Sequence, residues 1–224
     1  MKINHKNFEI ELLDDLNNDL DSIIKSENNQ IYFGSEKKDP EYRNRHYIIV
    51  KELGIEISNV TVYETNSASG IYEDTFIIED NKLWILSGNE IYCLEIPSLK
   101  LIWKKDFDRI TNFTLHKLEE DFIIYGELEI FRITKNGEII WRFGGRDIWV
   151  SVDEKKPFNI ESDKIRLFDF ESNEYVIDFN GNQIEDNPRI IQKKIKKNIK
   201  SKKSNYNKKA NIAIIEKYNN FIYF

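Results

Sequence analysis

The sequence predicts an all-β protein built from about four antiparallel repeats. The chain is rich in aromatic residues, with 14 Phe, 11 Tyr and 4 Trp, and such side chains fit half-buried pleated surfaces. From residue 31 to residue 184 it consists of short apolar segments separated by polar turns, which is the pattern of short strands. Several of these segments recur at a fixed distance along the chain, as in repeat architectures.

The clearest recurrence has a period of 38 residues. Residues 84–88 (WILSG) align with residues 122–126 (FIIYG), and the same shift aligns residues 101–103 (LIW) with residues 139–141 (IIW). An aromatic start, a glycine and a strand that ends in tryptophan therefore recur together. This agreement at three separate places predicts two copies of one supersecondary unit.

Residues 7–25 precede the repeats and predict a short strand followed by a short helix. Phe8, Ile10 and Leu12 alternate with acidic residues, as on a half-buried strand. The apolar residues between Leu13 and Ile24 then follow with helical spacing.

Four units are predicted, near residues 31–63, 83–107, 121–149 and 164–185, each with three strands joined by hairpins. In the first unit the expected strands are residues 31–34, residues 47–51 and a third that begins at Ile55. Turns at Gly54, Gly137 and Gly181 suit hairpins, because glycine readily adopts the positive φ that tight turns need.

Residues 130–141 (IFRITKNGEIIW) resemble the blade motif of quinoprotein-like β-propellers, in which a strand, a turn with glycine and a strand ending in tryptophan follow one another. Residues 94–103 are similar but lack the turn glycine. The resemblance implies a small or incomplete β-propeller over residues 31–185, in which stacked units cover each other's faces. A closed ring, an open arc and an assembly completed by a second copy all remain open. No quinone-binding or calcium-binding set accompanies the motif, so no cofactor is expected.

Charge divides the chain into two parts. The net charge is −6, but residues 187–224 hold Arg189 and ten Lys against Glu216, so residues 1–186 carry −16. An acidic domain disfavours nucleic-acid binding, which needs positive charge against phosphates, and it suits a basic partner. The Lys-rich tail is predicted to be partly helical or disordered, and it is the part of the chain that could bind nucleic acid.

The cysteine and histidine residues carry no motif. Cys93 is the single cysteine, so no intrachain disulfide forms, and its apolar strand predicts a buried thiol rather than a nucleophile. His5, His46 and His116 are far apart and lack metal-ligand spacing, so no metal site is expected. No apolar stretch is long enough for a signal peptide or a membrane span, which favours a cytoplasmic protein of bacterial type.

Candidate binding residues lie in three loops that follow equivalent strands. If the units stack, residues 64–75, 106–113 and 144–157 should gather on one rim, and loops on a rigid scaffold often bind ligands. Residues 144–145 are interpreted as a bend between units, residues 148–152 as a strand, and Glu127 with Glu129 as sharing one strand face. The candidates are Ser69, Tyr72, Glu73, Asp108, Arg109, Glu127, Arg146, Asp147 and Trp149.

The leading functional hypothesis is a non-catalytic protein-binding module, because no recognisable catalytic set accompanies the repeats. One form of it is a bacterial immunity-type protein that neutralises a basic partner. One alternative is a small-ligand-binding or hydrolytic protein on the same rim, with Glu73, Asp108 and Asp147 as carboxylates and Arg109 or Arg146 as anion binders. The other is nucleic-acid binding through the tail.

Overall fold

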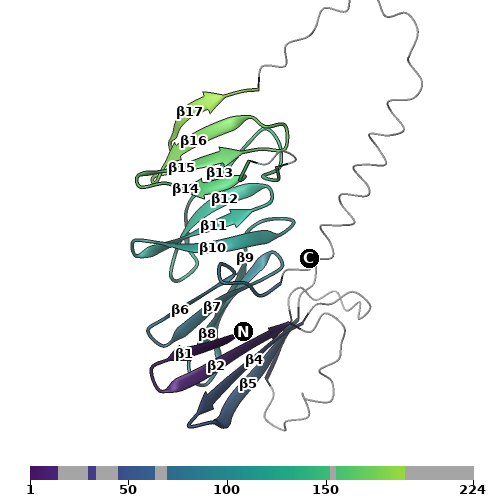
Figure 1. Ribbon diagram of the computed structural model, residues 1–224, viewed down its shortest axis with the longest axis vertical. Coiled ribbons are helices and arrows are strands. Elements are labelled where there is room, and N and C mark those ends of the chain that lie inside the picture. The colour runs from purple at the N-terminus through teal and green to yellow at the C-terminus, as the bar shows by residue number, and fades with distance from the viewer. Residues whose placement is uncertain (15–29, 34–44, 64–69, 152–154, 190–224) are drawn as a thin grey trace, which may run out of the picture. The chain divides into compact units, whose positions relative to one another are not determined.

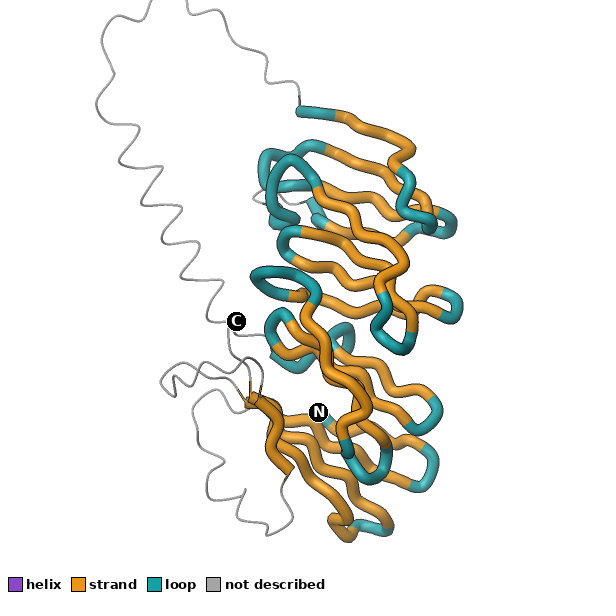
Figure 2. The backbone as a smooth tube through the Cα atoms, turned by 180° about the vertical axis from the view of Figure 1, so that it is seen from behind, coloured by secondary structure: helices purple, strands orange, loops and turns teal. Residues whose placement is uncertain are grey.

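The computed structural model describes residues 1–14, 30–33, 45–63, 70–151 and 155–189. These residues form four β-sheets and contain no helix (Figures 1 and 2). They belong to one compact unit, Met1–Arg189, while Ile190–Phe224 form a second unit. The predicted basic tail beyond Arg189 lies outside the described residues.

Each sheet is an antiparallel meander of four strands, and the first carries one strand more. Sheet A contains, in spatial order, β1 (Lys2–His5), β2 (Phe8–Asp14), β4 (Arg45–Glu52), β5 (Ile55–Tyr63) and β3 (Gln30–Phe33). Sheet B contains β6 (Phe76–Glu79), β7 (Lys82–Ser87), β8 (Glu90–Glu95) and β9 (Leu101–Asp106).

The other two sheets repeat this order. Sheet C contains β10 (Asn112–Leu118), β11 (Asp121–Gly126), β12 (Glu129–Thr134) and β13 (Ile139–Gly144). Sheet D contains β14 (Phe158–Ile160), β15 (Lys164–Phe168), β16 (Glu174–Asp178) and β17 (Gln183–Asn187). Four stacked four-stranded meanders are the architecture of propeller blades, so the predicted all-β, blade-like class is confirmed.

Backbone irregularities recur at equivalent places and identify the repeat. In every sheet the register shifts by one residue between the third and fourth strands of the meander. The first turn of sheets A, B and C begins with a residue at a φ of 54°, namely Lys6, Asp80 and Glu119. Strands β1, β2, β4 and β5 therefore correspond to β6–β9 and to β10–β13.

This correspondence corrects the first predicted unit. Residues 31–34 do not begin an antiparallel unit, because β3 pairs in parallel with β5 at the edge of sheet A, with Ile31 opposite Thr61. The first two strands of that unit are β1 and β2, and β2 pairs directly with β4. The alternating residues around Ile10 therefore belong to the repeat. In the sequence, the first two strands of this repeat (β1 and β2) are separated from the last two (β4 and β5) by the chain between Asp14 and Arg45.

Two further expectations change at strand boundaries. The predicted helix within residues 7–25 does not begin at Leu13, because Leu13 and Asp14 continue β2; residues 15–25 lie outside the described residues. The units expected near residues 83–107, 121–149 and 164–185 each lack their first strand, because β6, β10 and β14 precede them. These edge strands are short or half-polar, and their pattern is weaker than that of the buried strands.

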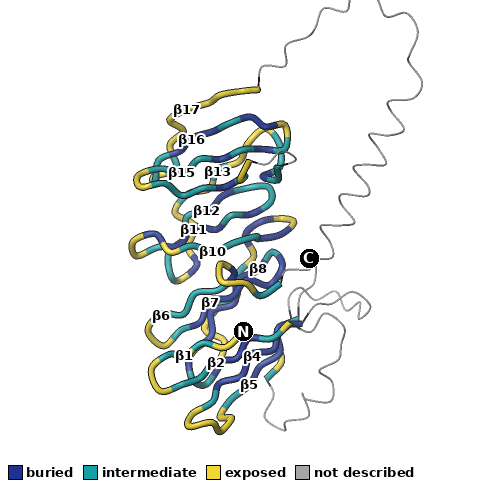
Figure 3. Tube along the Cα trace, viewed as in Figure 1, coloured by how far each residue is buried: buried dark blue, intermediate teal, exposed yellow. Residues whose placement is uncertain are grey.

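Three hydrophobic cores join neighbouring sheets in chain order. In sheet B, Leu83 and Ile85 face sheet A, while Trp84 and Leu86 on the same strand face sheet C. Successive strand residues point to opposite faces, so burial on both faces requires a continuous apolar run instead of an alternating one. This explains why the middle of β7, Leu83 to Leu86, and of β8, Ile91 to Leu94, is apolar without alternation, and Figure 3 shows these strands buried.

The second face of the last sheet carries charged residues. Arg166 lies on that face of sheet D and forms ion pairs with Glu161 at 2.7 Å and with Glu174. Its neighbours Ile165 and Leu167 point the other way, into the core with sheet C. Among the described residues no hydrophobic core joins sheet D to sheet A. The face of sheet D away from sheet C thus carries an ion-paired arginine beside the buried Val176.

Candidate functional site

The ends of the strands form two rims. The connector rim comprises residues 70–75, 107–111, 145–151 and 155–157, which lie between successive sheets in the chain, with turns 88–89, 127–128 and 169–173. The hairpin rim comprises the turns at the opposite strand ends. On the connector rim, backbone hydrogen bonds connect neighbouring loops and turns. The N–H donors and carbonyl acceptors are Phe107 to Asn89, Glu127 to Thr111, Trp149 to Glu127 and Phe170 to Ile148.

Asp108 is the anchor of the loop between sheets B and C. Its carboxylate accepts hydrogen bonds from the backbone N–H groups of Ile110 at 2.8 Å, Leu128 at 2.7 Å and Glu129 at 3.0 Å. A Cβ atom on Gly126 would lie 2.6 Å from this carboxylate, so the glycine permits the close approach. Because Asp108 is 1% exposed, it supports the rim from within and is not available to a partner.

Trp149 is likewise a core residue. Its ring lies 5.2 Å from that of Tyr175 and 6.0 Å from that of Phe143, and the side chain is fully buried. A Cβ atom on Gly145 would lie 2.6 Å from the indole, which explains a glycine at the bend between sheets C and D. The expected strand at residues 148–152 is absent over its described part, residues 148–151. The burial of Trp149 corrects the expectation that it faces a ligand.

Glu127 lies in the turn between β11 and β12, so it does not share a strand face with Glu129 as predicted. Burial raises the pKa of the Glu127 carboxyl, and the nearby Asp108 carboxylate raises it further. Glu129 instead faces Arg142, at 3.7 Å. The structure thus brings Glu127, Asp108 and Trp149 together around one turn.

The remaining candidates sit nearer to solvent. Tyr72, Glu73 and Arg109 are exposed, and the ring of Tyr72 covers Gly70. Arg146 forms an ion pair with Asp186, and its guanidinium lies 5.2 Å from the ring centre of Tyr175. These contacts use its charge internally. Asp147 and Ser69 are the last two candidates. Asp147 accepts a hydrogen bond from the N–H of Ile148, and Ser69 lies outside the described residues.

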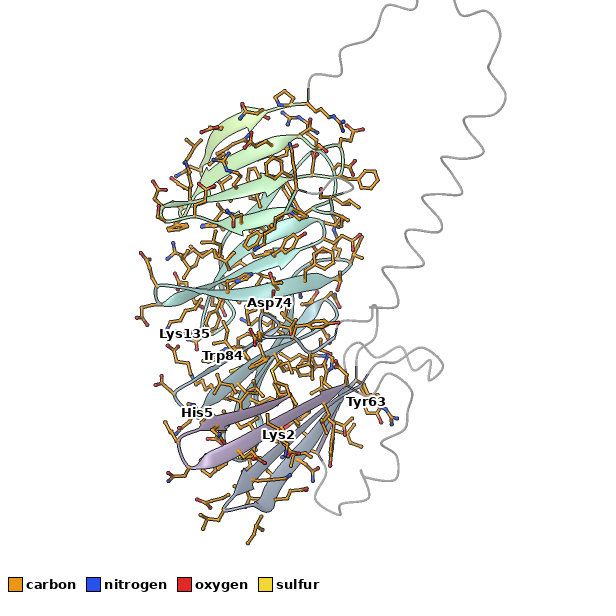
Figure 4. The ribbon with its side chains drawn as sticks, in the orientation of Figure 1. Lys2, His5, Tyr63, Asp74, Trp84 and Lys135 are labelled. Atoms are coloured by element: carbon orange, nitrogen blue, oxygen red, sulfur yellow. The ribbon has the colours of Figure 1, made fainter. Side chains whose placement is uncertain are left out.

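Several acidic residues of the hairpin rim form ion pairs with basic residues of the fold, and one of them, Glu79, joins two sheets. Lys135 of sheet C lies 2.6 Å from Glu79 of sheet B and 3.0 Å from Glu120, and Lys117 also pairs with Glu79. These two lysines hold the pKa of Glu79 below its usual range. The carbonyl of Lys135 accepts the indole N–H of Trp84 at 3.1 Å, and Figure 4 shows the two residues side by side.

The connector rim differs in this respect. Its carboxylates make no ion pair with any other described residue. Asp108 and Asp169 are buried and hydrogen-bonded within the fold; the others are Glu73, Asp74, Glu127, Asp147 and Glu171. The rim also carries the basic residues Arg109, Lys155 and Lys156. Charges that are not paired within the protein are available to a partner.

A pocket of about 330 Å³ opens between β10 of sheet C and β14 of sheet D. Phe158 lies in its wall. Its ring centre is 5.2 Å from that of His116 and 4.9 Å from that of Tyr125, and both pairs are stacked. The hydroxyl of Tyr125 donates to the Trp149 carbonyl, and burial raises the pKa of this phenol. The full lining is Asp74, Thr114, His116, Tyr125, Lys156, Pro157, Phe158, Asn159 and Ile160.

His116 is the central polar group of this pocket. Its Nε2 atom lies 2.7 Å from the Thr114 hydroxyl, which makes one hydrogen bond. Burial lowers the pKa of the imidazole; Asp74 acts in the opposite direction, and Lys156 lowers it further. The ring is therefore neutral near pH 7, with one donor and one acceptor nitrogen. Sequence reasoning missed this pocket because its residues come from three separate parts of the chain.

The other titratable residues serve the packing. Cys93 is fully buried, as predicted, and burial raises the pKa of its thiol to about 12. His5 contacts the carbonyl of Asp80 at 2.5 Å, and His46 contacts Asp14 at 2.8 Å. The described residues contain no group of three or more His, Cys, Asp or Glu side chains placed to hold a metal ion. They also contain no helix long and apolar enough to cross a membrane.

Comparison with solved structures finds several similar folds. The Pan2 WD40 domain of Neurospora crassa is 15% identical, with 52% of this chain aligned to 38% of that chain at a TM-score of 0.40. BamB from Moraxella catarrhalis is 15% identical, with 66% aligned to 47% at 0.46. The computationally designed Ika8 protein is 10% identical, with 67% aligned to 47% at 0.44.

This chain spans less than half the length of each of these three structures. No family model matches it, and no curated protein matches it. Because the similarity is low, the blade architecture rests on the strand pairing of the four sheets themselves.

Proposed function

We propose that this chain is a non-catalytic protein-binding module whose connector rim takes a basic protein partner. The observation that carries the proposal is that no carboxylate of the connector rim is ion-paired with a described residue. On the hairpin side Glu79, Glu120 and Asp121 pair with basic residues of the fold, although Glu52, Asp80 and Asp163 do not. Unpaired surface charge attracts and orients an oppositely charged protein.

The charge of the whole domain supports the same direction. Residues 1–186 carry a net −16, which generates a long-range field that speeds encounters with a cationic protein. The field is screened by salt, so association should slow as ionic strength rises. A basic toxin is one partner that fits this chemistry, and the chain would then act as an immunity-type protein in the cytoplasm.

The alternative of a hydrolytic rim has less support. Asp108 holds three backbone N–H groups, and Arg146 is paired with Asp186, so two of its proposed groups are committed to the fold. A general acid or base must reach its substrate. Neither residue lines the described pocket.

The test compares two triple charge reversals. Glu73, Asp147 and Glu171 are changed to Lys on the connector rim; as a matched control, Glu52, Asp80 and Asp163 are changed to Lys at hairpin turns. All six carboxylates lack an ion pair with a described residue, and the change of net charge is identical. Each protein is tagged, expressed in its native cells and purified, and the co-purifying proteins are quantified by mass spectrometry.

We expect a basic protein to co-purify in stoichiometric amount with the wild type and with the hairpin-rim variant, and to be lost from the connector-rim variant. Equal loss from both variants would mean that net charge alone holds the partner. Absence of a protein partner from the wild type, or retention by the connector-rim variant, would overturn the proposal.

A further inference from the structure

The pocket between sheets C and D combines an apolar wall with two opposite charges that do not pair. Phe158, Pro157 and Ile160 supply apolar surface from one short stretch of chain. The volume of about 330 Å³ lies at the lower end of the range for small-ligand sites. A pocket of this volume and lining fits a small molecule with an apolar part.

The two charges of the pocket come from different loops of the chain. Asp74 precedes β6 of sheet B, and its carbonyl accepts the N–H of Leu115 at 2.7 Å, which fixes this loop against β10. Lys156 precedes β14 of sheet D. Both line the pocket together with His116. Neither charge makes an ion pair with a described residue, and they do not pair with each other.

From this arrangement we infer that the pocket binds a free α-amino acid with an apolar side chain. Its ammonium group would face Asp74, its carboxylate would face Lys156, and its side chain would lie against Phe158 and Ile160. The second ring nitrogen of His116, Nδ1, has no partner among the described residues and can contact the polar end of the ligand. Two charged contacts at fixed positions select a zwitterion over a molecule with one charge.

The inference goes beyond protein binding. Asp74 and Lys156 belong to loops of the connector rim, but neither is altered in the connector-rim variant. A failure of one proposal therefore leaves the other intact. The two are tested with separate variants.

The experiment titrates the full chain with L-phenylalanine, L-leucine, L-isoleucine and L-methionine in a calorimeter. Phenethylamine and 3-phenylpropionate serve as singly charged analogues of phenylalanine. The variants are Asp74→Asn and Lys156→Gln. Glu73→Gln and Lys155→Gln are matched controls, because each changes the same type of charge at the neighbouring residue, which does not line the pocket. Unfolding curves without ligand show that each variant is folded.

We expect at least one of these amino acids to bind, and the singly charged analogues to bind more weakly by about ten-fold or more, the effect of losing one charged contact. Asp74→Asn and Lys156→Gln should each weaken binding by a similar factor, while the two controls retain it. Failure of all four amino acids to bind would overturn the inference. Equal binding of a singly charged analogue, or full affinity in both pocket variants, would also overturn it.

Discussion

The indole N–H of Trp141 donates a hydrogen bond of 2.9 Å to the carbonyl of Phe179, and thereby attaches the fourth strand of sheet C to the last turn of sheet D. Trp103 does the same one sheet earlier, with 3.2 Å to the carbonyl of Lys135. The two tryptophans that end the aligned strands in the sequence are thus equivalent contacts between sheets. On sheet A the hydroxyl of Ser58 donates to the carbonyl of Pro97 in the corresponding place.

The first prediction concerns the glycine under this contact. Gly181 has a φ of +81°, and a Cβ atom there would lie 2.7 Å from the ring of Trp141. Gly181→Ala should therefore destabilise the fold by the cost of an alanine in this backbone conformation, about 1–2 kcal/mol, and by an overpacking cost of about 1–3 kcal/mol. Chemical denaturation measures both together.

Gly54→Ala separates the two costs. Gly54 has nearly the same φ, +79°, but a Cβ atom there would meet nothing within 4 Å. We expect this variant to lose only the backbone term. Equal losses of unfolding free energy in the two variants would show that the Trp141 ring adds no steric cost at Gly181.

A second prediction concerns Asp108. Asp108→Asn replaces one carboxylate oxygen with an N–H₂ group, which cannot accept the backbone N–H groups of Ile110, Leu128 and Glu129 in the same way. Leaving a buried donor unsatisfied costs about 1–3 kcal/mol, so the free energy of unfolding should fall by at least that amount.

Asp147→Asn is the matched control, because Asp147 accepts one hydrogen bond, from the adjacent Ile148 N–H at 2.8 Å. We expect a change within about 0.5 kcal/mol there, as for most surface substitutions. Should the two variants be equally stable in urea, Asp108 would not be the anchor of its loop.

The third prediction is a pH dependence of stability. Glu11 of sheet A is 7% exposed and lies 2.5 Å from Lys2 and 2.8 Å from Lys51. Hydrogen bonds to these two lysines lower the pKa of its carboxyl from 4.5 to about 2. In the unfolded chain the carboxyl takes up a proton at higher pH than in the folded one. Its contribution is thus complete above pH 4.5 and is lost as the pH falls to about 2.

Glu11→Gln should reduce the unfolding free energy near neutral pH and flatten its slope between these two pH values. Glu9→Gln, on the same strand but with a side chain 39% exposed, is the control. Thermal unfolding followed between pH 2 and pH 7 measures both. An unchanged slope in Glu11→Gln would contradict the assignment.

Strands that bury both faces could be predicted from sequence. Trp84 and Phe122 align because β7 and β11 follow turns of equal length, and both strands lie between two sheets. Sheet A could not be recognised as one repeat, because the chain leaves it after Asp14 and returns at Arg45. A search for a repeat at a fixed spacing cannot detect a unit that is interrupted in this way.

The candidate site was less accessible to sequence reasoning. Residues 64–75, 106–113 and 144–157 were expected to gather on one rim. Asp108 and Trp149 turn inward, because the strand ends leave buried N–H groups and apolar surface for them to cover. His116 carried no motif, since Asp74 and Lys156 reach it from distant loops. Only the stacking of the sheets brings these three residues together.

The most direct test of the central claim is the association rate constant of the co-purified basic partner, measured at low and at high salt. For the wild type and for the Glu52, Asp80 and Asp163 variant, we expect rapid association at low salt that slows steeply as salt rises. For the Glu73, Asp147 and Glu171 variant, association at low salt should be slower by about ten-fold or more, with a weaker salt dependence. The same rate constant for both triple variants would contradict binding through the connector rim.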